Sequence, residues 1–244
     1  MGENKMIKLI QLELKRNKLK TYVISTGFIT LSLVVFMYMF LFVSTQTDIS
    51  GDVYIKNALS NYETIILLIN IISCVCFTTL SGVMYAGFVI NEYSGKRAIL
   101  LFSYPVSPRR IIFTKLLIVS LFTFLGYILS SLLAYTIFFI GESFIHIVPD
   151  TLTVVKLVMI VKITLIMSFL SSGLGMIAMR IGFSKKSVPV TIVSAFTLSV
   201  IPSNIISNAI GITWFPFVFM VISLIIGMAV FVNLVSAVNK IEVK

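Results

Sequence analysis

Six long apolar runs divide this sequence, and they constrain its fold more than any other feature. The runs are Thr21–Val43, Tyr62–Ile90, Ile111–Ile140, Thr151–Met179, Val188–Ile206 and Phe215–Val238. A helix needs about 20 apolar residues to cross the hydrocarbon core of a bilayer, so each run can supply one transmembrane helix. Only 11% of the 244 residues are charged, whereas soluble domains carry about 25%. The sequence therefore predicts an all-α membrane protein, with one transmembrane domain of six helices over residues 1–244.

The basic residues predict how these helices are oriented. Six spans place both termini on the same side, and basic residues gather before the first run, between the second and third, between the fourth and fifth, and at the C-terminus. Lys115 is counted with the cytoplasmic basic residues between the second and third runs. Of the 19 basic residues, only Lys56, Lys156 and Lys162 fall on the other side, where Glu142 is expected in the outer loop after the third run. Because basic loops stay in the cytoplasm, we expect both termini to be cytoplasmic. The net charge of +10 then reflects membrane topology, and no nucleic-acid partner is expected.

Three segments outside the spans have a recognisable pattern. Residues 1–20 contain apolar side chains at helical spacing opposite lysines, which predicts a cytoplasmic interfacial helix; a plain positive anchor is the alternative. Residues 202–216 carry two prolines and Trp214, which predicts a re-entrant hairpin in the outer leaflet. If residues 151–161 form an interfacial helix, Lys162 can extend its ammonium to the outer interface. The alternative is a Lys162 that lines a transport path.

Motifs for catalysis or cofactor binding do not occur. The sequence has no phosphate-binding loop, no serine nucleophile motif and no zinc motif. Cys74 and Cys76 lie two residues apart, so on a helix they point in different directions, and the chain has one histidine. We therefore expect no catalytic residue, no metal and no cofactor in this chain, which is not expected to be an enzyme. Uphill transport would need energy from another subunit.

The segment Asn91–Arg110 is the most specific part of the sequence. It contains the apolar group Ile99–Phe102 between Lys96-Arg97 and Arg109-Arg110. A connector that only crosses water has no use for such an apolar group. The pattern predicts a short amphipathic element that contacts a partner at the membrane surface.

This segment resembles the coupling helix of ABC-2 type exporter permeases. In that family a Glu-containing stretch leads into apolar residues, a Pro-Val-Ser stop and basic residues. The residues that carry the resemblance are Glu92, Tyr93, Gly95, Ile99, Leu100, Leu101, Phe102 and Pro105. Lys96-Arg97 stand where many relatives have Gly-Thr. The resemblance extends to six spans, an N-terminal interfacial helix and a hairpin before the last span.

The resemblance implies a function for the whole chain. Residues 91–110 would dock in a groove of a separate ABC ATPase, which binds ATP-Mg. Two ATPase copies would serve a homodimer or pseudo-dimer of permeases in the bacterial plasma membrane. The substrate would be amphipathic or hydrophobic, such as a peptide, in systems of peptide export or antimicrobial resistance. Side chains that could line its path are Thr79, Ser81, Thr191 and Ser194. The alternative is a membrane immunity or interaction protein that works without ATP.

Overall fold

The structure is a computed structural model of the whole chain. It describes residues 19–46, 61–91, 108–145, 153–208 and 214–241. Within these ranges every regular element is a helix and no strand occurs. Six of the helices are long and apolar enough to cross a membrane, which is the architecture of a multi-pass membrane protein.

The six helices follow the apolar runs of the sequence closely. They are α2 (Leu19–Gln46), α4 (Tyr62–Tyr85), α7 (Pro108–Ile145), α8 (Val154–Lys185), α9 (Val188–Asn208) and α10 (Trp214–Ile241). A short π-helix, η1 (Ala86–Ile90), continues α4 without a break. The six predicted spans are therefore confirmed as helices, and each boundary lies within a few residues of its run except at the C-terminal ends of α7 and α8, where the helix extends further.

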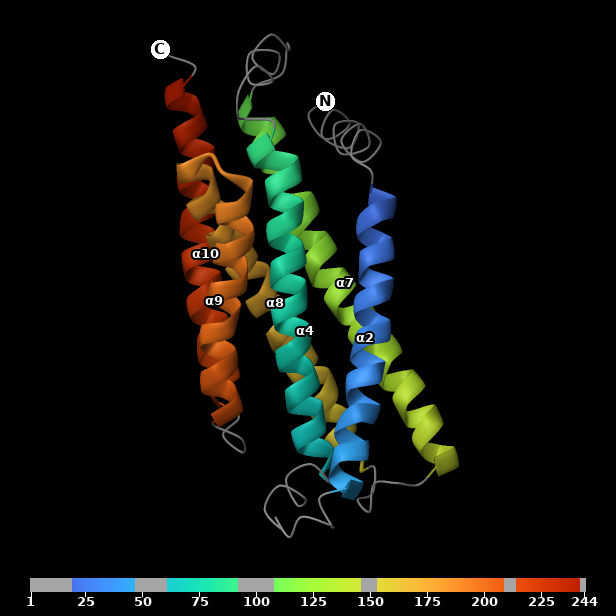
Figure 1. The fold of residues 1–244 in the computed structure, drawn as a ribbon. Helices are drawn as coiled ribbons and strands as arrows, with labels where there is room; N and C mark the ends of the chain where they lie inside the picture. Colours follow the sequence, from blue (N-terminus) through green and yellow to red (C-terminus); the bar gives the residue numbers. More distant parts are fainter. Residues whose placement is uncertain (1–18, 47–60, 92–107, 146–152, 209–213, 242–244) are drawn as a thin grey trace, which may run out of the picture.

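Successive helices run in alternating directions across the bundle (Figure 1). We call the end where α4–η1 finishes and α7 begins the near end. Helices α2 and α9 also begin there, and α8 and α10 finish there. The opposite end of the bundle is called the far end. The start of α2 and the end of α10 therefore lie at the same end of the bundle, as an even number of spans requires.

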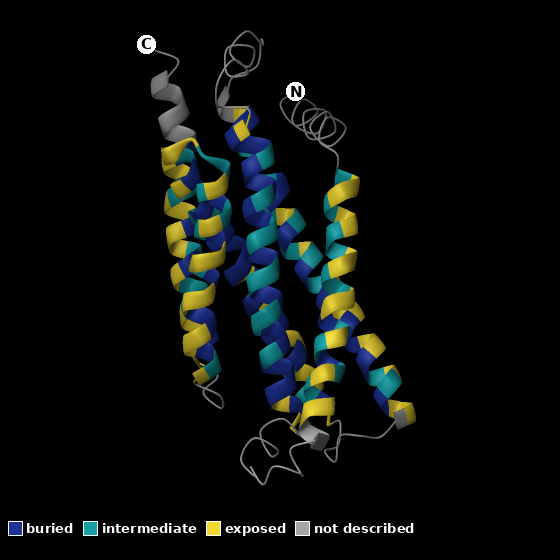
Figure 2. Ribbon diagram, viewed as in Figure 1, coloured by how far each residue is buried: buried dark blue, intermediate teal, exposed yellow. Residues whose placement is uncertain are grey.

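Burial distinguishes the central helix of the bundle, α4, from the outer ones. Helix α4 is the most buried and packs against α8, α9, α7 and α2. Helices α2 and α10 expose most of their apolar surface, so they appear largely yellow in Figure 2. An apolar exterior of this size is unfavourable in water and suits contact with lipid. The bundle is therefore built around α4, whose near end carries η1.

Small residues let the helix backbones approach each other. A Cβ on Gly82 would fall 2.7 Å from Ala195 Cβ, and one on Gly173 would fall 2.9 Å from the Ser223 carbonyl oxygen. Ser172 also shares a 2.8 Å hydrogen bond with Ser120. Close contact between small side chains is the usual way that transmembrane helices associate. These positions serve packing within the chain.

The turn between α8 and α9 explains their antiparallel pairing. Lys186 adopts a left-handed conformation with φ 48°, a position that usually holds glycine. The Ser187 amide donates to the Gly182 carbonyl over 3.2 Å, and the Lys186 amide donates to the Phe183 carbonyl over 3.2 Å. This pair of bonds closes the end of α8, and α9 then begins at Val188, with Pro189 in its first turn.

Two expectations about the far end are wrong. Helix α8 is continuous from Val154 to Lys185, so residues 154–161 do not form a separate interfacial helix. No glycine or proline interrupts this stretch, and Lys162 is exposed on the surface of α8. Glu142, expected in an outer loop, is instead buried within the last turns of α7. Aliphatic and aromatic residues continue past it and sustain the helix.

The predicted hairpin over residues 202–216 corresponds to three parts of the structure. Residues up to Asn208 continue α9, which accommodates Pro202 inside the helix, and Trp214 begins α10. Residues 209–213 lie outside the described residues, as do residues 1–18 of the predicted interfacial helix. A re-entrant hairpin and an N-terminal interfacial helix remain predictions.

Candidate functional site

Two helix ends at the near end of the bundle flank the segment predicted to contact a partner, and we call them its two stems. All eight residues that carry the resemblance lie between 92 and 107, outside the described residues. The described structure begins again on either side, with Asn91 at the end of α4–η1 and Pro108 at the start of α7. The candidate site must therefore be built from these two stems.

The first stem ends in a π-helix. Over Ala86–Ile90 the backbone is wound more widely than an α-helix, and the Asn91 amide donates to the Ala86 carbonyl five residues earlier. Such segments are rare, usually a single turn long, and frequent at functional sites. Four of its five residues are buried: Ala86, Phe88, Val89 and Ile90. The wide turn is thus held inside the bundle and does not fray at its surface.

The second stem carries a buried lysine that reaches the first. Lys115 lies in the second turn of α7 and is 0% exposed. Its Nζ donates to the Phe88 carbonyl oxygen of η1 over 2.8 Å. Burying an ammonium is costly unless it is hydrogen-bonded, so this contact strongly favours one arrangement of the two stems. We call η1 together with Lys115 the Lys115 joint.

Three further contacts place the Lys115 joint against the rest of the bundle. The Tyr22 ring of α2 packs edge-on against Phe88 with 5.7 Å between centroids. The Tyr85 hydroxyl donates to the Leu116 carbonyl over 3.4 Å. A Cβ on Gly182 of α8 would fall 2.9 Å from Cδ1 of Ile90. The π-helix therefore touches α2, α7 and α8 within one turn.

The four predicted path residues lie in different surroundings. Ser81 and Thr191 are buried where α4, α8 and α9 meet, and their hydroxyls donate to nearby backbone carbonyls, those of Thr78 and Ser187 respectively. Thr79 is half-buried and donates to Val75 over 2.8 Å. In this conformation Ser81 and Thr191 face helix contacts within the chain, so a path along them would need α4, α8 and α9 to separate.

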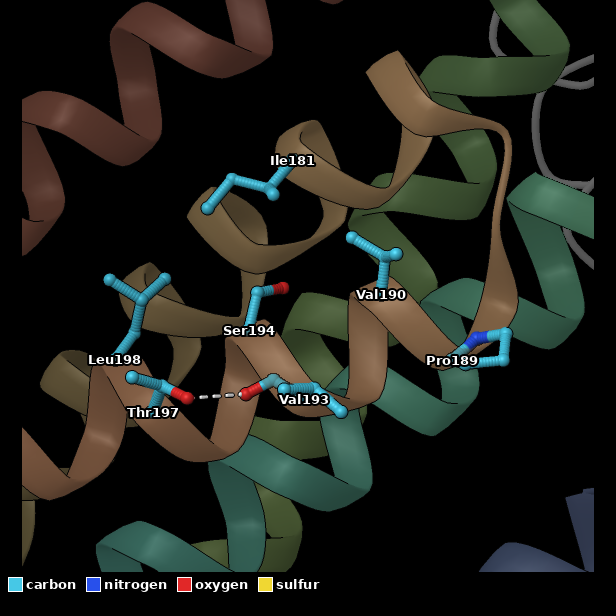
Figure 3. A pocket seen from close by; sticks show the side chains of 7 residues that line it. All are labelled: Ile181, Pro189, Val190, Val193, Ser194, Thr197 and Leu198. Atoms are coloured by element: carbon cyan, nitrogen blue, oxygen red, sulfur yellow. Dashed lines mark hydrogen bonds between the residues drawn. The ribbon is translucent and has the colours of Figure 1, made fainter.

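Ser194 alone of the four lines a surface groove. The groove has a volume of about 450 Å³ and lies between α8 and α9 (Figure 3). Its lining is almost entirely apolar: Ile181, Pro189, Val190, Val193, Ser194, Thr197 and Leu198. The Ser194 hydroxyl donates to Thr191 over 2.9 Å and lies 3.3 Å from the Ala178 carbonyl. The groove offers no free charge to a ligand and suits an alkyl chain.

A second buried polar group links α4 and α7 nearer the far end. The Asn70 amide donates to Tyr135 Oη over 2.6 Å and to the Ile66 carbonyl over 2.9 Å. Tyr135 donates in turn to the Ile66 carbonyl over 3.2 Å. The Tyr127 hydroxyl lies 2.9 Å from the Asn70 carbonyl and 3.1 Å from its Oδ1. We call these residues the Asn70 cluster.

The described residues contain no group of three or more histidine, cysteine, aspartate or glutamate side chains that could hold a metal. Cys74 is buried and Cys76 half-buried, and both are free thiols. Cys74 Sγ lies 4.0 Å from the Thr78 hydroxyl, at the limit of a sulfur hydrogen bond. The two cysteines pack as small apolar residues in α4.

Comparison with known proteins gives one distant relative. An uncharacterized protein of Bacillus subtilis (strain 168), YcbO, is 26% identical over 196 residues, which cover 80% of this chain and 83% of the relative. No protein-family model matches the sequence. No solved structure matches it either. The likeness to YcbO extends over most of the six-helix domain and carries no description of what that protein does.

The Lys115 joint is the feature of the candidate site that the sequence did not predict. Lys115 was expected among the basic residues of a cytoplasmic loop, but it lies in the buried core of the bundle. One signal could have identified it. Lys115 lies three residues after Ile112 and four before Val119, on the same face of α7, and both of these are buried. The π-helix leaves no comparable signal in a single sequence.

Proposed function

We propose that this chain is the transmembrane permease subunit of an ATP-driven ABC-2 type exporter in the bacterial plasma membrane. It moves an amphipathic or hydrophobic substrate, of which a peptide is the favoured class, out of the cytoplasm. It works as a homodimer or pseudo-dimer with two copies of a separate ABC ATPase, which bind ATP-Mg. Both termini and residues 91–110 face the cytoplasm.

The observation that carries this proposal is the apolar group Ile99–Phe102 on a segment whose two stems meet at the near end. The Lys115–Phe88 hydrogen bond, 2.8 Å long, ties those stems together inside the bundle. An apolar group held on a braced stem suits insertion into a preformed groove on a partner. The flanking basic residues suit a partner surface that is acidic.

The six-helix architecture supports the same proposal. The apolar helices supply a membrane domain, and the described residues contain no metal-binding group. A membrane domain without an ATP-binding motif requires a partner to supply the energy of uphill transport. The wide exposed apolar surfaces of α2 and α10 leave room for lipid or for a second permease.

Co-purification tests the proposal directly. The tagged chain, extracted from its native membranes, should retain an ABC ATPase that mass spectrometry identifies by its phosphate-binding loop. Leu100→Asp and Phe102→Asp should each abolish this association, because a carboxylate cannot enter an apolar groove without losing its hydration. Ser94→Asp, which adds the same charge outside the apolar group, is the matched control and should retain the ATPase.

Two results would contradict the proposal. The first is wild-type chain that retains no ABC ATPase in any membrane preparation, as the ATP-independent alternative requires. The second is export that survives a hydrolysis-dead ATPase, measured as accumulation of a dansyl-labelled amphipathic cationic peptide in inside-out vesicles. If Leu100→Asp and Phe102→Asp both leave association intact, the apolar group is not the contact.

A further inference from the structure

The Lys115 joint combines two features that packing alone does not require. An uninterrupted α-helix would close the end of α4 with better hydrogen bonds than a π-helix does. A methionine or leucine would fill the Lys115 position without burying a charge. Both features occur at one contact, and that contact joins the two stems of residues 92–107. Their coincidence points to a role in motion.

The end of α4 can be wound in two ways, as the observed π-helix or as an α-helix. One residue of an α-helix corresponds to about 100° of rotation, so rewinding η1 as an α-helix would turn the residues after it by about that angle relative to α4. Phe88 lies in the middle of η1, and its carbonyl is the atom that Lys115 holds. The hydrogen bond therefore acts on the part of the backbone whose winding would change.

The position of Lys115 suits it to link movements of the two stems. It lies seven residues into α7, about 10 Å along the helix axis, and its neighbours Ile112 and Leu116 are fully buried. The same turn of η1 contacts Tyr22 of α2 and approaches Gly182 of α8. A displacement of either stem would therefore change contacts among α2, α4, α7 and α8 together.

We propose that the Lys115 joint is the coupling element through which residues 92–107 drive the transmembrane helices. This inference rests on the proposed function for the energy source, but it assigns the transmission to described residues. Lys115 is a positioning residue: its ammonium holds the Phe88 carbonyl so that η1 and α7 move together. When the joint is intact, movement of the docked segment turns α4. When it is broken, the segment moves without the bundle.

Three variants test the joint, and a fourth serves as the control. Lys115→Met keeps an unbranched side chain one atom shorter and removes the ammonium, whereas Lys115→Arg keeps a charged donor. Deleting Gly87 removes one residue from η1, so that the remaining chain can wind as an α-helix with its flanks in place. Lys20→Met removes an exposed lysine at the same end of the bundle and should behave as wild type.

Amide hydrogen exchange in lipid nanodiscs tests the local role of Lys115 without any partner. In Lys115→Met, exchange of the amides of residues 86–91 should rise roughly tenfold, as expected when a charge-assisted hydrogen bond is lost from a local opening unit. Exchange across the Asn70 cluster should not change. Unaltered exchange at 86–91 would overturn the proposal, because Lys115 would then not hold η1.

Transport with the co-purified ATPase tests the coupling. Lys115→Met and the Gly87 deletion should retain the ATPase and keep its basal ATP hydrolysis within twofold. Accumulation of the dansyl-labelled peptide in inside-out vesicles should fall about tenfold, within the usual range of a coupling free energy between two sites. Lys115→Arg should keep most of the accumulation. Equal transport by wild type and both disrupting variants, or loss of the ATPase from them, would overturn the coupling role.

The two experiments separate this inference from the proposed function. If wild-type chain retains no ABC ATPase, the proposed function fails, while the exchange result still decides whether Lys115 holds η1. If the ATPase is retained and Leu100→Asp releases it, but Lys115→Met transports normally, only the coupling inference fails. If Lys115→Met does not insert into the membrane, the Gly87 deletion carries the test alone.

Discussion

The Asn70 cluster and the Lys115 joint join the same two helices by different physical means. In the Asn70 cluster, neutral groups satisfy one another through four short hydrogen bonds, and α4 is regularly wound around them. In the Lys115 joint, the contact to the π-helix is a charged one, from the Lys115 ammonium to the Phe88 carbonyl. The difference suggests that α4 is fixed to α7 nearer the far end and adjustable at the near end.

The energetic character of the two contacts follows from their chemistry. Interhelical hydrogen bonds between neutral groups in membrane proteins contribute on average about 0.6 kcal/mol and at most about 1.7 kcal/mol. A network whose members bond one another loses more when its central member is removed, because several buried hydrogen bonds are lost together. A charged contact close to the end of the bundle can exchange its carbonyl for water when it opens. We therefore expect stability to depend on the first and transport on the second.

The largest effect should come from removing the centre of the Asn70 cluster. Asn70→Ala deletes the donor to Tyr135 and the Oδ1 acceptor of Tyr127, and it leaves each buried tyrosine hydroxyl with a backbone carbonyl in place of the side-chain network. The free energy of unfolding should fall by about 2 to 3 kcal/mol. This free energy is measured by unfolding the protein in mixed micelles of dodecyl maltoside and SDS and following its helix content by circular dichroism.

Lys115→Met is the control for this prediction. It should lower the unfolding free energy by less than Asn70→Ala, because methionine fills the same space without a buried charge. If Lys115→Met proves the more destabilising of the two, the near end is the fixed point of α4, and the comparison must be reversed.

A matched pair of tyrosine variants gives an intermediate effect. Tyr135→Phe removes a hydroxyl that accepts a 2.6 Å bond and donates a 3.2 Å bond, so it should cost about 1 to 1.7 kcal/mol of unfolding free energy. Tyr85→Phe removes a single 3.4 Å bond to Leu116 and should cost under about 0.5 kcal/mol. Both rings are almost completely buried, so their packing terms match.

The same mixed-micelle unfolding measurement compares the pair. Equal costs for Tyr135→Phe and Tyr85→Phe would show that hydrogen bonds at the far end contribute no more than those at the near end. A larger cost for Tyr85→Phe would show that the near end is held by more than the Lys115 contact.

Much of the fold could be predicted from the sequence, because length and hydropathy decide which segments cross a membrane. All six apolar runs became helices. Charge at the ends of helices was harder to place. Glu142 and Lys115 were assigned to loops, yet both lie in buried turns of α7, since an apolar helix can continue past a single charge that finds a partner.

The candidate site was predictable only in part, and for a physical reason. The pattern around Ile99–Phe102 shows that a contact is made, but it does not show what holds the segment. The bond between Lys115 and Phe88 joins residues 27 apart, and it exists only because α4 and α7 pack side by side. A π-helix adds a fraction of a turn without any required residue type, so its position emerges from packing and not from local propensity.

The smallest effect should come from Gly87, in the Lys115 joint. A Cβ at this position would fall 3.0 Å from the Tyr22 hydroxyl, which is the movable end of a side chain. Gly87→Ala gains helix propensity of up to about 1 kcal/mol and loses a similar amount to this crowding. Its unfolding free energy should therefore stay within about 0.5 kcal/mol of wild type.

A double-mutant cycle separates these two opposing terms. Tyr22→Phe removes the hydroxyl that a new Cβ would meet, so Gly87→Ala in that background should stabilise the protein by about 0.5 kcal/mol more than it does in wild type. Gly126→Ala is the matched control, because a Cβ there would meet Phe77 at 3.4 Å and no part of α2. Its effect should be the same with or without Tyr22. A coupling of zero for Gly87 would mean that η1 already moves away from α2 at little cost, which would make the near end still more adjustable than the contact with Phe88 implies.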